Sequence, residues 1–170
     1  MSQHLVELQH KQLIVVIVPY ITLKDQISEK LAGAGLTVLQ SHEMKKNMNI
    51  ILNGTSDVDV IITVVDSFVN DKQQWHFSAL AQHNRISRII IDEAHEFFVD
   101  SFRPVFSNLS AIFGNDCYRY TNYTLLSATL SESFINLMKK SILPGSFEDK
   151  IILNSDETPL PHQTTFKTDV

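Results

Sequence analysis

Two adjacent carboxylates and a histidine follow an apolar stretch of the chain. Residues 88–92, RIIID, run directly into Glu93, Ala94 and His95. A carboxylate at the end of a buried strand, here Asp92, is suited to holding Mg²⁺ against nucleotide phosphates. A second carboxylate beside it can orient or deprotonate an attacking water. The same pair can instead cap a helix at 93–98, because negative charge is favourable at a helix N-terminus. The tetrapeptide alone leaves both interpretations open.

A zinc site is excluded at this position. The metalloprotease pattern H-E-x-x-H needs a second histidine four residues after His95, and that position is Val99. Cys117 is the only cysteine, so the chain has neither a disulfide framework nor a cysteine metal site.

A second short motif ends another apolar run. Residues 122–129, NYTLLSAT, finish in Ser127, Ala128 and Thr129, and Ser127 lies 35 positions after Asp92. As a bare tripeptide, S-A-T is also explained by hydroxyls that cap the next helix. D-E-A-H and S-A-T at the ends of successive buried strands form a much rarer combination, which favours a shared site.

Strand-like and helix-like segments alternate along the chain. Apolar runs predict strands at 13–18, 36–40, 58–65, 88–92, 122–129 and 151–153. Helical patterns predict a helix from a T-x-x-D capping box at Thr22 to a stop at Gly33, and helices at about 42–53, 73–83, 101–113 and 131–141. This alternation predicts an α/β fold with a parallel sheet.

The chemistry of such a sheet lies outside the carboxyl ends of its strands. Four predicted strand ends therefore converge on one rim. They carry Pro19 and Thr22, Asp66 and Ser67, Asp92 and Glu93, and Ser127 and Thr129.

These motifs resemble those of the superfamily 2 helicases, and most closely the RecQ branch. That family carries D-E-A-H as motif II and an S/T-A-T triplet as motif III. Its motif Ia is similar to PYITLKDQ at 19–26, and its D-F-R-P stretch is similar to DSFRP at 100–104, with one inserted serine. The resemblance covers roughly residues 12–155 and implies a partial RecA-like domain of the P-loop NTPase type. It leaves 1–11 as an N-terminal extension and 156–170 as a linker or domain edge.

The resemblance also implies roles for the motif residues. Asp92 would hold Mg²⁺ through the nucleotide, Glu93 would activate water, and His95 with Ser127–Thr129 would couple ATP hydrolysis to strand movement. ATP and Mg²⁺ are the implied cofactors of the complete enzyme. DNA, as a single strand or a duplex junction, is the implied partner, with RNA as the alternative. A second RecA-like domain is expected in the complete protein.

Nucleic-acid contacts are expected near motif Ia and near the end of the strand at 58–65. The residues so implied are Pro19, Thr22, Lys24, Asp66, Ser67 and Arg103. Lys24 is also explained as a solvated helix residue, and Arg103 as a partner of Asp100.

The chain departs from the family in several places. None of its five glycines is followed by lysine, so the 170 residues contain no G-x-x-x-x-G-K-[ST] phosphate-binding loop. That loop is expected upstream of Met1, and the chain alone is then expected to lack useful ATP affinity. The aromatic-rich loop of RecQ proteins has no counterpart: Phe97 and Phe98 are interpreted as core residues, and Trp75 as structural.

Composition bounds the remaining interpretations. The net charge of -5 argues against a generic basic nucleic-acid binder, and no apolar run is long enough to cross a bilayer. The expected location is intracellular, in the nucleus or wherever DNA is handled. Three alternatives to a DNA helicase portion stay open: a non-catalytic nucleic-acid or protein interaction module, a superfamily 2 RNA helicase fragment, and a remnant gene product without function.

Overall fold

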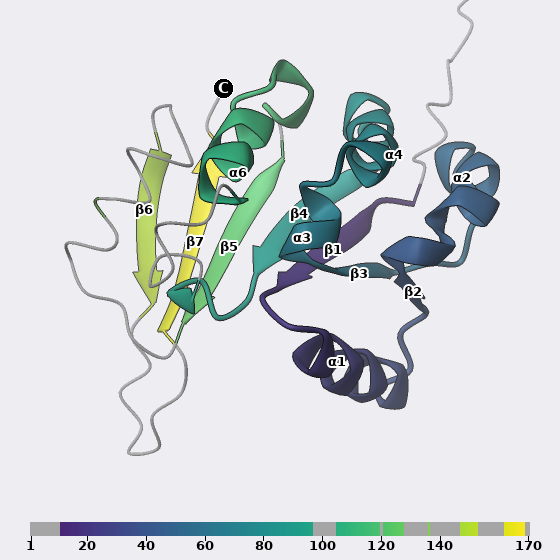
Figure 1. Cartoon of the computed structure of the whole chain (residues 1–170), viewed down its shortest axis with the longest axis horizontal. Coiled ribbons are helices and arrows are strands. Elements are labelled where there is room, and N and C mark those ends of the chain that lie inside the picture. The colour runs from purple at the N-terminus through teal and green to yellow at the C-terminus, as the bar shows by residue number, and fades with distance from the viewer. Residues whose placement is uncertain are drawn as a thin grey trace, which may run out of the picture.

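A computed structural model describes residues 11–96, 105–119, 121–127, 136, 147–152 and 162–168 (Figure 1). The strands are β1 (Leu13–Val18), β2 (Val38–Gln40), β3 (Val60–Val64), β4 (Ile86–Ile91), β5 (Asn122–Ser127), β6 (Phe147–Ile152) and β7 (His162–Thr168). The helices are α1 (Ile21–Gly33), α2 (Met44–Leu52), α3 (Val65–Phe68), α4 (Asp71–Gln82) and α6 (Val105–Phe113). Short 3-10 turns lie at Ser41–Glu43 and Asp116–Tyr118.

The strands form one sheet in the order β2-β3-β1-β4-β5-β7-β6. The first five strands of that order are parallel to one another, which confirms the predicted α/β class and parallel sheet. β5 follows β4 directly in the sheet, with Ile91 opposite Leu125, so the two motif-bearing strands are neighbours. Their carboxyl ends therefore open onto the same rim.

The C-terminal part of the sheet differs from the sequence expectation. β7 pairs antiparallel with β5, and β6 pairs antiparallel with β7. The polar segment read as a linker or domain edge thus contains a strand, His162–Thr168. Its threonines and Phe166 favour extended backbone, and pairing satisfies the edge of β5 that would otherwise be open.

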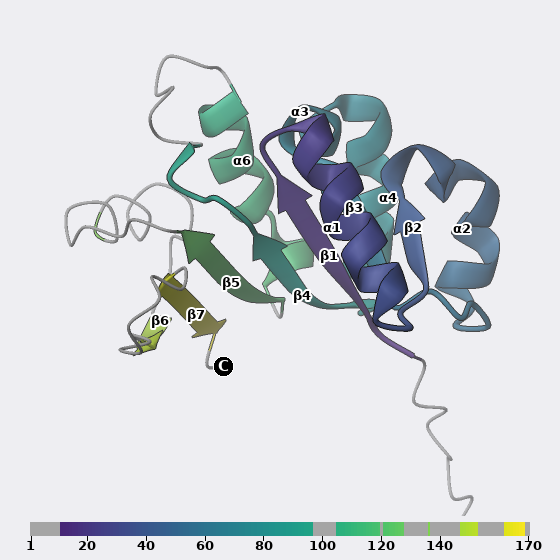
Figure 2. The same cartoon turned by 90° about the horizontal axis from the view of Figure 1, so that it is seen from below.

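Helices cover the two faces of the sheet unequally. α1 lies on one face, whereas α2, α3, α4 and α6 lie on the other (Figures 1 and 2). The smaller core joins Val16, Val18, Val60 and Ile62 to the apolar stripe of α1, which is Leu23, Ile27 and Leu31. The larger core fills the other face and includes an aromatic group under α3, α4 and α6, made of Phe68, Phe77, Phe113, Tyr118 and Tyr123.

Several local expectations change. α1 begins at Ile21 with Tyr20 as its N-cap, and no side chain caps it, so the predicted capping box at Thr22 is wrong. The observed N-cap, Tyr20, directly follows Pro19 and lies two residues before the Thr22 that this pattern assumed. Trp75 is 67% exposed and is not a core residue. The predicted helix at 131–141 falls almost wholly outside the described residues, as do residues 101–104 of the helix predicted at 101–113.

Candidate functional site

The D-E-A-H segment forms a turn that is fixed to the strands on either side of β4. The backbone N–H of Asp92 donates to the carbonyl of Ile17 at the end of β1, at 2.9 Å. The N–H of Ala94 donates to the carbonyl of Leu126 at the end of β5, at 2.8 Å. Ala94 is fully buried, so a larger side chain at this position could not extend into solvent. The turn is thereby held between two strand ends.

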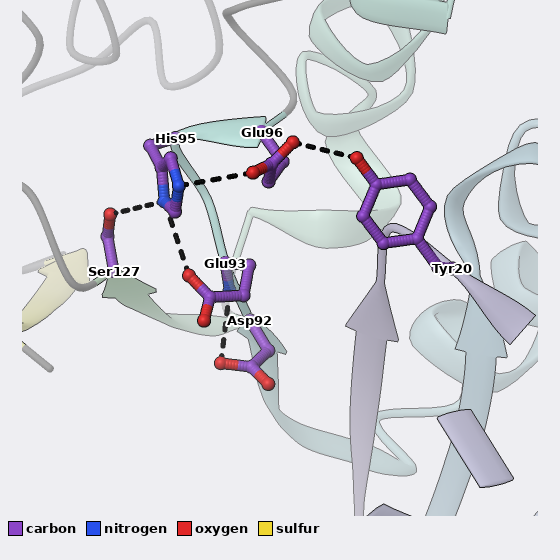
Figure 3. A network of polar contacts seen from close by, with 6 residues as sticks. All are labelled: Tyr20, Asp92, Glu93, His95, Glu96 and Ser127. Atoms are coloured by element: carbon purple, nitrogen blue, oxygen red, sulfur yellow. Dashed lines mark hydrogen bonds and ion pairs between the residues drawn. The ribbon is translucent and has the colours of Figure 1, made fainter. Parts of the chain in front are cut away.

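Glu93 adopts a backbone conformation that is uncommon for a residue with a side chain. Its φ is 47°, in the left-handed region. Such a conformation costs free energy and persists only when the surrounding structure determines it. The two backbone hydrogen bonds of Asp92 and Ala94 flank this residue and supply that constraint. Their effect is to aim the Glu93 carboxylate toward the ring of His95 (Figure 3).

Asp92 is a partly buried carboxylate at the strand end. Its Oδ1 accepts a hydrogen bond from the backbone N–H of Glu93 at 3.0 Å. Burial raises the pKa of Asp92, and that hydrogen bond offsets part of the rise. Within the described part of the chain, the second carboxylate oxygen receives no hydrogen bond, so it is available to a cation.

The donor set fits Mg²⁺ only in company with a nucleotide. Among the described residues, no group of three or more His, Cys, Asp or Glu side chains could hold a metal ion. Mg²⁺ in nucleotide sites is held by one or two carboxylates together with substrate phosphates and water. Asp92 would be the protein ligand, and the ion, when bound, would neutralise phosphate charge.

Replacing Asp92 with asparagine is expected to stabilise the folded chain at pH 7. The raised pKa means that the folded state binds the Asp92 proton more tightly than the unfolded state does, so the charged form carries a stability penalty above that pKa. Asp92→Asn removes the penalty and keeps the acceptor for Glu93. Because the side chain is only partly buried, we expect a gain of about 1 kcal/mol or less, or about 2–4 °C in Tm.

Calorimetry across pH checks this prediction. The Tm difference between Asp92→Asn and the wild type should be largest at pH 7 and shrink toward the ordinary carboxyl pKa of about 4, since acid relieves the same penalty in the wild type. A variant that is less stable than the wild type at pH 7 would contradict it.

His95 joins the turn to the end of β5. Its Nδ1 lies 2.9 Å from Ser127 Oγ and 3.2 Å from Glu93 Oε2. The buried Glu93 Oε2 has no hydrogen-bond partner among the described residues, and the His95 ring is the polar group placed beside it. His95 therefore lies in contact with both Glu93 and Ser127. Ala128 and Thr129, the other residues of the expected coupling motif, lie outside the described residues.

Two residues that sequence reasoning missed extend this network. His95 Nε2 lies 3.3 Å from Glu96 Oε1, and the Tyr20 hydroxyl donates to Glu96 Oε2 at 2.7 Å (Figure 3). Tyr20 follows β1, so the network reaches a third strand end. Only their positions in the sequence could have pointed to these two residues. Tyr20 follows Pro19 at a strand end, and Glu96 follows His95.

The residues expected to contact nucleic acid are distributed over the ends of β1 and β3, which are neighbouring strands. Thr22 is exposed in the first turn of α1. Asp66 is exposed and Ser67 is half-buried in the short helix α3, which follows β3. Lys24 is engaged within the fold, because its Nζ donates to Gln40 Oε1 at 2.9 Å and lies 3.6 Å from Asp25 Oδ1. Arg103 lies outside the described residues.

Comparison with known proteins adds one result. A family model described as DEAD/DEAH box helicase matches residues 1–137, which is more than half of the chain. No individual curated protein matches the chain. In the described part of the chain, no helix has both the length and the apolar character to cross a membrane.

Proposed function

The chain belongs to the DEAD/DEAH box helicases, ATP-dependent enzymes that act on nucleic acid, and from this premise we propose that it forms the motif Ia to motif III portion of a RecQ-like DNA helicase. The observation that carries the proposal is the D-E-A-H turn, fixed between the ends of β1 and β5 with His95 in contact with Ser127. In this proposal the place of action is wherever the cell handles DNA.

The proposed roles follow the geometry of the turn. Asp92 would hold Mg²⁺ on the nucleotide. Glu93, whose backbone is constrained in one orientation, would accept the proton of the attacking water. His95 contacts both Glu93 and Ser127. A displacement of the end of β5 would therefore change the position of His95 relative to Glu93, the proposed general base. When bound, ATP with its Mg²⁺ supplies the phosphoryl group that is transferred to water.

Two further stretches support the RecQ branch over an RNA helicase. Residues 19–26, PYITLKDQ, are similar to the RecQ motif Ia, and residues 100–104, DSFRP, are similar to the stretch that follows D-E-A-H in that branch. Neither similarity distinguishes the activities by itself, so the substrate is assigned to DNA as part of the proposal.

The N-terminus of α1 is the proposed contact for a backbone phosphate. α1 has 13 residues, no side chain caps its first turn, and that turn contains no acidic residue. Its free N–H groups and the positive end of the helix dipole favour an anion there. Thr22 lies in this first turn and is exposed, and its hydroxyl is a further donor.

The variant Thr22→Glu tests this contact. A carboxylate in the first turn stabilises the helix by about 0.3–1 kcal/mol, so loss of binding would not report unfolding. The expected result is single-stranded DNA affinity at least about tenfold lower, measured by fluorescence anisotropy with a labelled oligonucleotide. Ala32→Glu is the matched control, because it adds the same charge to an exposed position at the other end of the same helix, beyond the screening length at physiological salt.

The outcomes separate the competing functions. Tighter binding to DNA than to RNA of the same sequence supports the RecQ-like assignment, and the reverse supports an RNA helicase. Equal effects of Thr22→Glu and Ala32→Glu would show that net charge, and not the α1 terminus, governs binding. No binding of either nucleic acid would overturn the proposal.

A further inference from the structure

We propose that Tyr20 and Glu96 are positioning residues that transmit nucleic-acid occupancy at the start of α1 to His95 and the D-E-A-H turn. This inference rests on the proposed function and extends it to two residues outside the motifs. The link is a continuous set of contacts from the end of β1 to the end of β5 (Figure 3).

The distances define the path. The Tyr20 hydroxyl donates to Glu96 Oε2 at 2.7 Å, a length typical of a hydroxyl bonded to a charged carboxylate. The other oxygen, Glu96 Oε1, lies 3.3 Å from His95 Nε2. On the far side of the ring, Nδ1 lies 2.9 Å from Ser127 Oγ. The Glu96 carboxylate thus uses its two oxygens for two different segments.

The position of Tyr20 makes it sensitive to the proposed contact. It is the N-cap residue of α1, so its backbone is part of the helix start that offers N–H groups to a phosphate. Tyr20 is 47% exposed, and its hydroxyl reaches Glu96, which follows the D-E-A-H turn and lies 76 positions later in the chain. In this proposal, a phosphate that binds the N–H groups in the first turn of α1 displaces the backbone of Tyr20. That displacement changes the hydrogen bond between the Tyr20 hydroxyl and Glu96.

His95 is the receiving end because it has no freedom to turn independently. Both ring nitrogens are in contact, Nε2 with Glu96 and Nδ1 with Ser127 and Glu93. A displacement of the Glu96 carboxylate changes the ring contacts, and the Glu93 carboxylate lies 3.2 Å from that ring. Nucleic acid bound at the N-terminus of α1 would in this way alter the surroundings of Glu93, the carboxylate proposed to activate water.

The experiment follows the ring of His95 by NMR in the whole chain, with ¹³C-labelled histidine and the signal assigned from His95→Asn. A deoxythymidine oligonucleotide is added to saturation, and anisotropy verifies saturation for every variant. We expect the wild-type His95 signal to shift on binding, and the shift to fall by at least about half in Tyr20→Phe and in Glu96→Gln. Glu29→Gln, which removes an exposed carboxylate from the body of α1, is expected to retain the full shift.

The outcomes distinguish this inference from the function on which it rests. If the oligonucleotide binds and Tyr20→Phe keeps the full His95 shift, the coupling through Tyr20 is wrong while the nucleic-acid function stands. If it binds and the wild-type His95 signal does not move, the same conclusion follows. If the chain binds no oligonucleotide, both the proposed function and the coupling fall.

Discussion

The 170-residue chain is expected to bind ATP with Mg²⁺ at least about ten-thousand-fold more weakly than a helicase domain that contains a phosphate-binding loop. Such a loop holds the phosphates with backbone N–H groups and a lysine, and the 170 residues contain no G-x-x-x-x-G-K-[ST]. Each charge-assisted hydrogen bond contributes about 1.5–3 kcal/mol. The loss of about four of them is about 6–12 kcal/mol, at about 1.4 kcal/mol per tenfold in affinity.

The site residues proposed for this chain would act on the metal and the water, and not on the phosphates. Asp92 offers one carboxylate, and the described residues contain no further cluster able to hold a metal ion. Titration calorimetry with ATP and Mg²⁺ is therefore expected to show a Kd no tighter than the millimolar range. Asp92→Ala is the matched variant, since it removes the proposed ligand without touching the phosphates.

A micromolar Kd that is lost in Asp92→Ala would contradict this prediction. It would mean that other residues of the chain hold the phosphates. A measured millimolar Kd together with DNA binding would support the interpretation that these residues engage nucleic acid without nucleotide. In that case a segment outside these 170 residues would have to supply the phosphate contacts for hydrolysis.

The part of the site that the sequence predicts is the part governed by the sheet. Residues 13–18 and 89–91 are continuous apolar runs, and such runs indicate strands covered on both faces. Once these strands are parallel, the carboxyl-end rule places Asp92 and Ser127 on one rim, and the observed contact between His95 and Ser127 agrees with that placement. Here local pattern and global topology specify the same arrangement.

The parts that the sequence does not predict depend on tertiary contacts. The link between Tyr20 and Glu96 joins residues 76 positions apart through two flexible side chains, and no periodicity reports such a contact. β7 is polar and follows two prolines, so its strand becomes visible only through its pairing with β5. Trp75 is interpreted as structural because it lies far from the D-E-A-H segment in the sequence, and the orientation of α4 leaves it exposed.

The substitution Phe77→Ala is expected to destabilise the chain by about 3–5 kcal/mol. Phe77 is fully buried on α4, and its ring centroid lies 4.8 Å from that of Phe68, which is also fully buried. Phe68 in turn packs on Phe113 of α6, at 5.8 Å between centroids. Truncation removes the apolar contacts of Phe77 and leaves a cavity between α3 and α4 that the packed neighbours cannot fill.

Urea unfolding followed by circular dichroism measures this loss, with Trp75→Ala as the control. The two aromatic residues stand two positions apart on α4, but Trp75 is 67% exposed, so its truncation should change stability by no more than about 0.5 kcal/mol. Fluorescence is unsuitable because Trp75 is the only tryptophan. Comparable losses in the two variants would mean that α4 presents a different face to the sheet. The larger core would then be packed differently. The positions of α3 and of the end of β3, which is followed by Asp66 and Ser67, would change with it.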